Sequence, residues 1–270
     1  MLKKKLYSFF IGAVWSVSMI TVALAAAPAA PAGEGRVIPY PAGYDTMREG
    51  ASAYNGLGNS GNSPYYSALD IYRLTSTDRL TILPRYKTYQ QTTEITCGPA
   101  AALTVLHHYG NTDWDERGIA AIMETKPEIG TDTAGMVKFF KQIGWNVESS
   151  LTAASDSGMT FATMQEFKDF VITNLKNNTP ILVENIDWGG HWRVIIGYDT
   201  MGTEPVADDV LILADSYDTA DHLQDGYAVN PAEKFYYMWF DAHMLPKGQR
   251  QQQWLTARPV QAGTGPAEQQ

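Results

Sequence analysis

Cys97 is the only cysteine in the chain and the side chain most suited to nucleophilic chemistry. It precedes an alanine-rich segment, 99–109, that predicts a helix. A thiol at the start of a helix faces unpaired backbone N–H groups and the positive end of the helix dipole, and both favour the reactive thiolate. The following Gly98 would let a substrate carbonyl approach the backbone closely. A buried, inert cysteine can also begin a helix, so this position alone leaves both interpretations open.

A thiol nucleophile needs a base, and His191 is the best placed of the five histidines. It follows Gly189 and Gly190, which leave room beside the ring, and it leads a β-rich run, 192–198. An imidazole beside a thiol can take its proton and later protonate the leaving amine. The others are interpreted as solvated or structural residues: His107, His108, His222 and His243.

The base in turn needs an acceptor that orients its second nitrogen. Asp215 ends the next predicted strand, 210–214, and would lie beside His191 if the two strands pair antiparallel. The alternative is that Asp215 is only a turn residue at the end of a strand. Asp199 and Asp218 are weaker candidates for the same role.

Two glutamines precede the cysteine and could stabilise an oxyanion. Gln91 lies six residues before Cys97, and Gln90 lies seven before it. A side-chain amide there can donate to the oxygen of a tetrahedral intermediate together with the backbone N–H of Cys97. Local chemistry does not decide between the two, and both could be solvated loop residues.

Three segments together resemble the C39-like peptidases of the papain-like cysteine peptidase superfamily: 91–100, 190–199 and 213–215. That family has a Gln six residues before a Cys-Gly pair, a Gly-His leading a strand and an Asp ending the next strand. It often has Asp-Pro where this chain has Asp215-Ser216. The resemblance covers about residues 85–245. It implies a papain-like fold and four roles: Cys97 as nucleophile, His191 as general base and acid, Asp215 as orienter and Gln91 as oxyanion donor.

The resemblance also bears on the reaction. The best-known relatives cut leader peptides after a double glycine and are fused to ABC transporters. This sequence shows no nucleotide-binding Gly-Lys loop, so we do not carry that substrate over. We expect a thiol hydrolase that cleaves peptide amide bonds through a thioester on Cys97. The alternatives are a thiol acyltransferase, as in the similar phytochelatin-synthase-like enzymes, and a non-catalytic peptide-binding module.

The elements that must position these residues come in two groups. Helical periodicity predicts helices over 99–109, 113–124, 133–143 and 163–175. Short β-rich runs between turn residues predict strands over 180–186, 192–198, 210–214 and 235–240, with further β-like runs within 68–89. Helices first and strands afterwards predict an α+β fold, with the Cys97 helix packed on an antiparallel sheet.

The N-terminus is typical of a targeting segment. Three lysines, an apolar run over 6–24 and the small-x-small pattern Ala23-Leu24-Ala25 predict a signal peptide over 1–25. The alternative is an uncleaved membrane anchor, because the apolar run is close to spanning length. In either case we expect an exported protein, periplasmic or extracellular, which contacts the membrane only if the segment stays uncleaved.

The remaining organisation follows from composition. Residues 26–66 form an Ala/Pro linker and an irregular segment, 67–248 the peptidase-like domain, and 249–270 a flexible, glutamine-rich tail. The 270 residues, 44% of them apolar, suffice for one domain with a sizeable core.

Charge and cysteine content narrow the possible partners. A net charge of −9 argues against binding nucleic acid through phosphate contacts. One thiol excludes an internal disulfide or a multi-cysteine zinc site, and the acidic residues of 215–225 match no EF-hand. We therefore expect a peptide or protein substrate and a reaction that needs no metal or organic cofactor.

Overall fold

The computed structural model describes residues 35–54, 69–153, 159–219 and 223–260. The predicted signal peptide lies outside these residues, so its prediction is not tested. Within the described part, no helix combines the length and the apolar character needed to cross a membrane.

An antiparallel sheet of seven strands forms the centre of the described part. The strands are β1 (Leu80–Ile82), β2 (Trp145–Ser149), β3 (Ile181–Asn185), β4 (His191–Asp199), β5 (Val210–Ala214), β6 (Tyr227–Pro231) and β7 (Gln253–Pro259). Their order is β2-β7-β3-β4-β5-β6, and β1 pairs with β4. β3 and nearly all of β4 are buried, as expected for continuous apolar runs that other elements cover.

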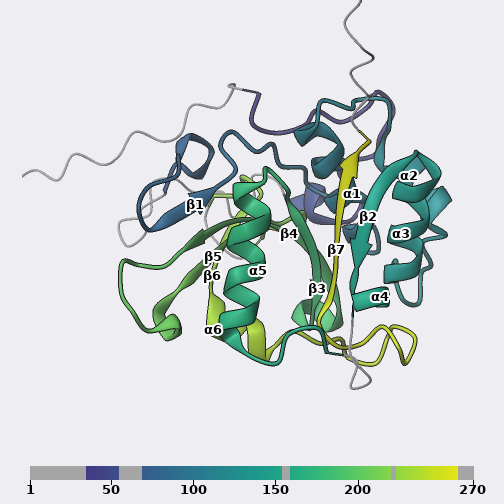
Figure 1. Cartoon of the computed structure of the whole chain (residues 1–270). Helices are drawn as coiled ribbons and strands as arrows, with labels where there is room; N and C mark the ends of the chain where they lie inside the picture. Colours follow the sequence, from purple (N-terminus) through teal and green to yellow (C-terminus); the bar gives the residue numbers. More distant parts are fainter. Residues whose placement is uncertain (1–34, 55–68, 154–158, 220–222, 261–270) are drawn as a thin grey trace, which may run out of the picture.

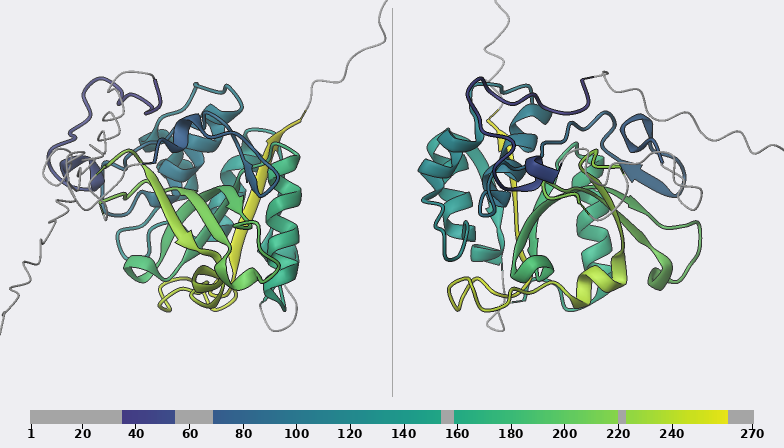
Figure 2. Two further views of the ribbon diagram at one scale, coloured as in Figure 1. Left: turned by 90° about the vertical axis from the view of Figure 1, so that its left-hand side faces the viewer. Right: turned by 180° about the vertical axis from the view of Figure 1, so that it is seen from behind.

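Helices pack on two regions of this sheet (Figure 1). They are α1 (Cys97–His108), α2 (Glu116–Met123), α3 (Thr133–Gln142), α4 (Ser150–Ala153), α5 (Met164–Lys176) and α6 (Ala232–Tyr237). α1, α2 and α3 pack together beside β2, while α5 lies along β4 and β1. The view from behind in Figure 2 again shows α5 and the α1–α3 group in separate places. The predicted α+β fold is confirmed, with Cys97 at the start of a helix packed on an antiparallel sheet.

Side-chain caps explain where several helices begin. Asp115 accepts the Gly118 N–H at the start of α2, and Asp132 accepts the Gly135 N–H at the start of α3. α5 begins with a capping box formed by Thr163 and Glu166. α1 differs because its N-cap residue makes no side-chain capping bond, so the backbone N–H groups around Cys97 are not capped in this way.

Two predictions about the C-terminal part are wrong. The predicted strand over 235–240 is instead α6 and the turn after it. Its aromatic residues favour a strand by propensity, but Phe235 and Trp239 are four residues apart and both pack on Phe167. Tertiary packing therefore decides this segment.

The tail predicted over 249–270 is also wrong in part, since β7 pairs with both β2 and β3. Residues 261–270 lie outside the described part. The packed domain thus continues past residue 248 to the end of β7. Besides β7, two further strands were not predicted, β2 and β6. Only β1 of the β-like runs within 68–89 forms a strand, because Ile71–Arg73 is a 3₁₀ helix.

Candidate active site

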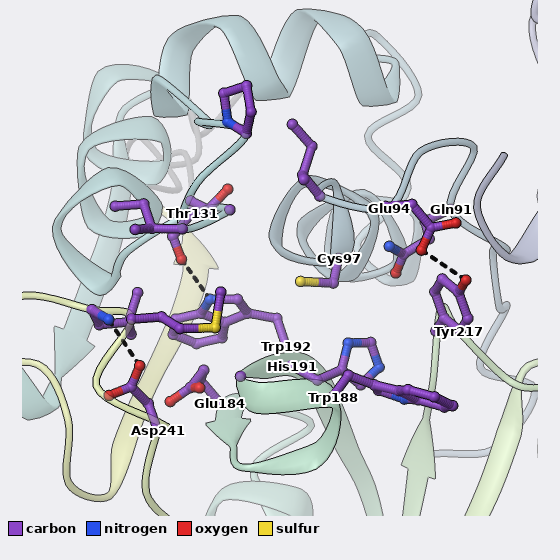
Figure 3. A pocket seen from close by; sticks show the side chains of 17 residues that line it. Gln91, Glu94, Cys97, Thr131, Glu184, Trp188, His191, Trp192, Tyr217 and Asp241 are labelled. Carbon is purple, nitrogen blue, oxygen red and sulfur yellow. Dashed lines mark hydrogen bonds between the residues drawn. The ribbon is translucent and has the colours of Figure 1, made fainter.

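Cys97 is the first residue of α1 and lies in the wall of a cavity of about 290 Å³. Its side chain is almost covered, with the residue 8% exposed. Figure 3 shows the thiol in the middle of the cavity, with His191 and Trp188 below it and Gln91 to one side. The helix start thus presents the sulfur to the cavity.

A buried carboxylate fixes the loop that leads to the cysteine. Glu116 of α2 accepts the backbone N–H of Thr92 at 2.9 Å and its hydroxyl at 2.7 Å. It also accepts the hydroxyls of Thr96 and Tyr89. The side chain of Thr96, the N-cap residue of α1, is therefore directed to Glu116 instead of to its own helix. The sequence around Glu116 carries no signal of this role, because its partners lie in another segment.

His191 and Asp215 meet as predicted. His191 begins β4, Asp215 directly follows β5, and these strands are antiparallel neighbours. The Nε2 atom of His191 lies 2.7 Å from Oδ1 of Asp215, and both side chains are buried. This bond leaves Nδ1 for the thiol, and Cys97 is one of the side chains that raise the pKa of His191.

The contact between His191 and Asp215 favours the protonated, charged form of the imidazole. Burial alone would lower the pKa of His191, but the charge and hydrogen bond of Asp215, together with Cys97, raise it to about 9. Burial would likewise raise the pKa of Asp215, yet His191, Arg193 and the backbone N–H of Tyr217 lower it to about 2. A charged imidazole beside a thiol is the arrangement that cysteine nucleophiles use for activation.

Arg193 supports this carboxylate from the same strand as the histidine. Its guanidinium donates to Asn185 at 2.8 Å and to Asp187 at 2.7 Å, and it lies 3.6 Å from Asp215. The residue is buried, so these partners replace water around its charge. This role of Arg193 is not among the predictions above, although an arginine inside an apolar strand is a usable signal.

The structure places the side chains of Gln91 and Gln90 in different environments. Gln91 lines the cavity, while Gln90 does not and only approaches the carbonyl of Gln224. The Gln91 amide donates to the carbonyl of Thr93 at 2.8 Å and accepts the Ser216 hydroxyl at 2.9 Å. Ser216, which stands where the family often has proline, therefore orients this amide.

Gly98 and Gly190 lie close to protein atoms. The sequence predicts instead that Gly98 admits a substrate carbonyl and that Gly190 leaves room beside the imidazole. A Cβ on Gly98 would lie 2.9 Å from Cβ of Thr131 and 3.0 Å from Sδ of Met136, so Gly98 allows α1 to pack closely on Thr131. A Cβ on Gly190 would lie 2.8 Å from Oε1 of Glu184. These two glycines therefore make room for protein atoms.

The other candidate residues lie away from the site. His107 and His108 are in the last turn of α1, and Asp199 is at the far end of β4. Asp218 and His243 do not line the cavity, and His222 is outside the described residues. In the described ranges, no group of three or more His, Cys, Asp or Glu side chains is arranged to hold a metal ion.

Aromatic side chains form one rim of the cavity. Trp188 is 70% exposed and adopts the left-handed backbone conformation, with φ 58°. Its ring centroid lies 5.5 Å from that of Tyr217, whose hydroxyl donates to Glu94 at 2.8 Å. A side chain of this size held in a strained backbone next to a cavity is typical of a ligand-contacting position.

We expect Asp215→Asn to change the pH dependence of catalysis. In the wild-type protein kcat/KM should fall at high pH only as His191 loses its proton, near its pKa of about 9. Without the neighbouring negative charge the imidazolium deprotonates more easily, so this limb should move down by about 1–3 pH units. The measurement is the pH profile of kcat/KM, and an unmoved alkaline limb would contradict the assignment.

This order of groups, with a thiol at a helix start, an imidazole and a carboxylate, defines a domain of the cysteine-peptidase type. A model of the Peptidase_C39 like family matches residues 84–243. The chain therefore belongs to this family, and the resemblance described above is confirmed. No curated protein matches the chain.

Two of the similar solved structures come from streptococci. One is the peptidase domain of Streptococcus ComA, described as a bifunctional ABC transporter involved in a quorum-sensing pathway. It is 19% identical, with 65% of this chain and 99% of that chain covered and a TM-score of 0.43. The other is the peptidase domain of Streptococcus mutans ComA. It is 16% identical, with 64% and 100% covered and a TM-score of 0.33.

Proposed function

We propose that this protein is a thiol hydrolase that cleaves peptide amide bonds. One observation carries the proposal, namely that a single imidazole lies between the only thiol and a buried carboxylate at the wall of a cavity. Membership of the Peptidase_C39 like family supports the same reaction class.

The residues suggest a two-step reaction. The Cys97 thiolate attacks the amide carbonyl, and the resulting oxyanion accepts hydrogen bonds from the backbone N–H of Cys97 and the amide of Gln91. The carbon–nitrogen bond breaks as His191 gives its proton to the leaving amine, which leaves a thioester on sulfur. A water molecule, deprotonated by His191, then attacks the thioester and releases the carboxylic acid and the thiol.

The acceptor of the acyl group distinguishes this proposal from acyl transfer. The test incubates the protein with a defined peptide mixture, with and without excess glycylglycine, and follows the products by mass spectrometry. We expect free carboxylates to dominate in both samples. If glycylglycine adducts dominate and carboxylates stay at background, the protein is a transferase, and if no peptide changes, it is a binding module.

Gln91→Ala is expected to lower kcat by about 10- to 1000-fold with little change in KM, because its hydrogen bond forms in the transition state. Gln90→Ala is the matched control, since that side chain lies outside the cavity. Steady-state kinetics on one peptide compare the two variants. An equal loss in both, or a loss from Gln90→Ala alone, would show that the oxyanion donor is assigned wrongly.

The proposed place of action is outside the cytoplasm and rests on the sequence of residues 1–25. We expect export with cleavage after Ala25. N-terminal sequencing of the protein recovered from its producing cells would distinguish the cleaved form from the anchored form.

A further inference from the structure

An acidic side chain that takes no part in the proposed reaction, Glu184, lines the cavity. Glu184 belongs to β3, lines the same cavity as Cys97 and is only 1% exposed. Neither carboxyl oxygen has a hydrogen-bond partner in the described part of the chain, and no ion pair there includes this side chain. A buried carboxyl without partners is unfavourable, so Glu184 retains an unmet capacity to bind.

The neighbouring acid, Asp241, already has hydrogen-bond partners, and Glu184 differs from it in this respect. Asp241 accepts the backbone N–H groups of His243 and Leu245 at 2.9 and 2.8 Å, and it lies 3.9 Å from Arg250. Figure 3 shows Asp241 and Glu184 near each other, on the side of Cys97 away from Gln91. Both carboxyls approach Gly190, where an added Cβ would lie 2.8 Å from Glu184 and 4.0 Å from Asp241.

The side chains around the Glu184 carboxyl favour the binding of a cation. Among the described residues, the cavity is lined by three carboxyl side chains, Glu94, Glu184 and Asp241, and by His191, and no lysine or arginine of that part lines it. Burial, Asp241 and Cys97 raise the pKa of Glu184 well above its usual value, and His191 offsets this only in part. An entering cation would pair with Glu184, relieve its repulsion by Asp241 and stabilise its ionised form.

We propose that Glu184 is a specificity-determining residue that binds a cationic group of the substrate, an ammonium or guanidinium, on the side of Cys97 opposite Gln91. This inference rests on the proposed function and names its substrate class, which is peptides with a positive charge close to the bond that is cut. The cation is either a Lys or Arg side chain or the free α-ammonium of the peptide, and the experiment separates these two sources.

The test measures binding, so it does not depend on turnover. Full-length protein carrying Cys97→Ser is titrated with hexa-alanine peptide amides in which one lysine occupies each position in turn. A parallel series carries norleucine, which has a similar length without the charge, and both series are made with acetylated and with free N-termini. We expect one lysine position to bind at least about tenfold more tightly than its norleucine counterpart.

Glu184→Gln in the Cys97→Ser protein should reduce the preference for lysine over norleucine at that position to about twofold or less. The matched control is Glu128→Gln, which removes the same charge from an exposed residue between Pro127 and Ile129, both of which line the cavity. It should keep the preference. Because Glu184 has no partner to lose, the amide should fold normally, and Glu184→Met provides a second neutral side chain if it does not.

The results have separate meanings. A preference confined to peptides with a free N-terminus identifies the α-ammonium as the cation, and one that persists in the acetylated series identifies the side chain. Equal binding of the lysine and norleucine series, no binding by any peptide, or a preference unchanged by Glu184→Gln overturns the inference. Tight, Glu184-dependent binding without hydrolysis by the wild-type protein would instead refute only the proposed function.

Discussion

Cys97→Ser is expected to reduce peptide hydrolysis by about 10⁴-fold or more while leaving the melting temperature nearly unchanged. The chain has no second thiol to replace Cys97, and a serine hydroxyl ionises far less readily beside the same imidazole. Hydrolysis rates are measured on a peptide that the wild-type protein cleaves. Turnover within a few-fold of wild type would remove Cys97 from the reaction.

Alkylation tests the same residue without a substrate. At slightly acidic pH, iodoacetamide should modify Cys97 faster than it modifies free cysteine, because the helix start and His191 favour the thiolate. The single cysteine makes the measurement specific. Slower reaction than free cysteine would indicate an inert structural thiol.

His191→Ala has the second largest expected effect, a loss of about 10³- to 10⁴-fold in kcat. The variant removes the group that takes the thiol proton and returns it to the leaving amine. The alkylation rate of Cys97 at acidic pH should fall with it, since the imidazolium that stabilises the thiolate is gone.

His107→Ala serves as the control, because this histidine lies in the last turn of the helix that Cys97 begins and does not line the cavity. It should keep nearly full activity. If it lowers kcat as much as His191→Ala without unfolding the protein, the assignment of His191 as the base is wrong.

Three of the four residues proposed for the reaction could be found from sequence because each has a local signal. Cys97 precedes a helix with a proline in its first turn, His191 opens an apolar strand, and Asp215 closes the next one. The choice of Gln91 over Gln90 came instead from the six-residue spacing to Cys97 that the family resemblance implies, because local chemistry left both open. Antiparallel pairing of neighbouring strands then brings two of them together, which is a short-range consequence of chain order.

Glu184 and Glu116 could not be found in this way. Glu184 stands in an apolar strand, and its meaning depends on Asp241, which comes from a loop far along the chain. Glu116 looks like an ordinary acidic residue in the first turn of a helix, yet its carboxylate holds the loop before Cys97. Such roles arise only when distant segments pack.

The wrong prediction for the C-terminal segment has a similar cause. Its glutamines suggest a solvated tail, but Gln252 is buried and exchanges two hydrogen bonds with the backbone of Phe161, at 2.8 and 3.0 Å. Gln253 accepts the hydroxyl of Thr133 in the same way. Polar side chains can be buried where their partners are complete, and those partners lie about ninety residues or more earlier in the chain.

The position of β7 has a consequence for the order of events during synthesis. This strand lies between β2 and β3 and ends at residue 259, so the sheet lacks an inner strand until the ribosome has released that segment. Until then one edge of β3 is unpaired, and the buried faces of Trp254 and Leu255 are absent from the core. We therefore expect the nascent chain to complete its core only after residue 259 has left the ribosome, long after the nucleophile and its base have been made.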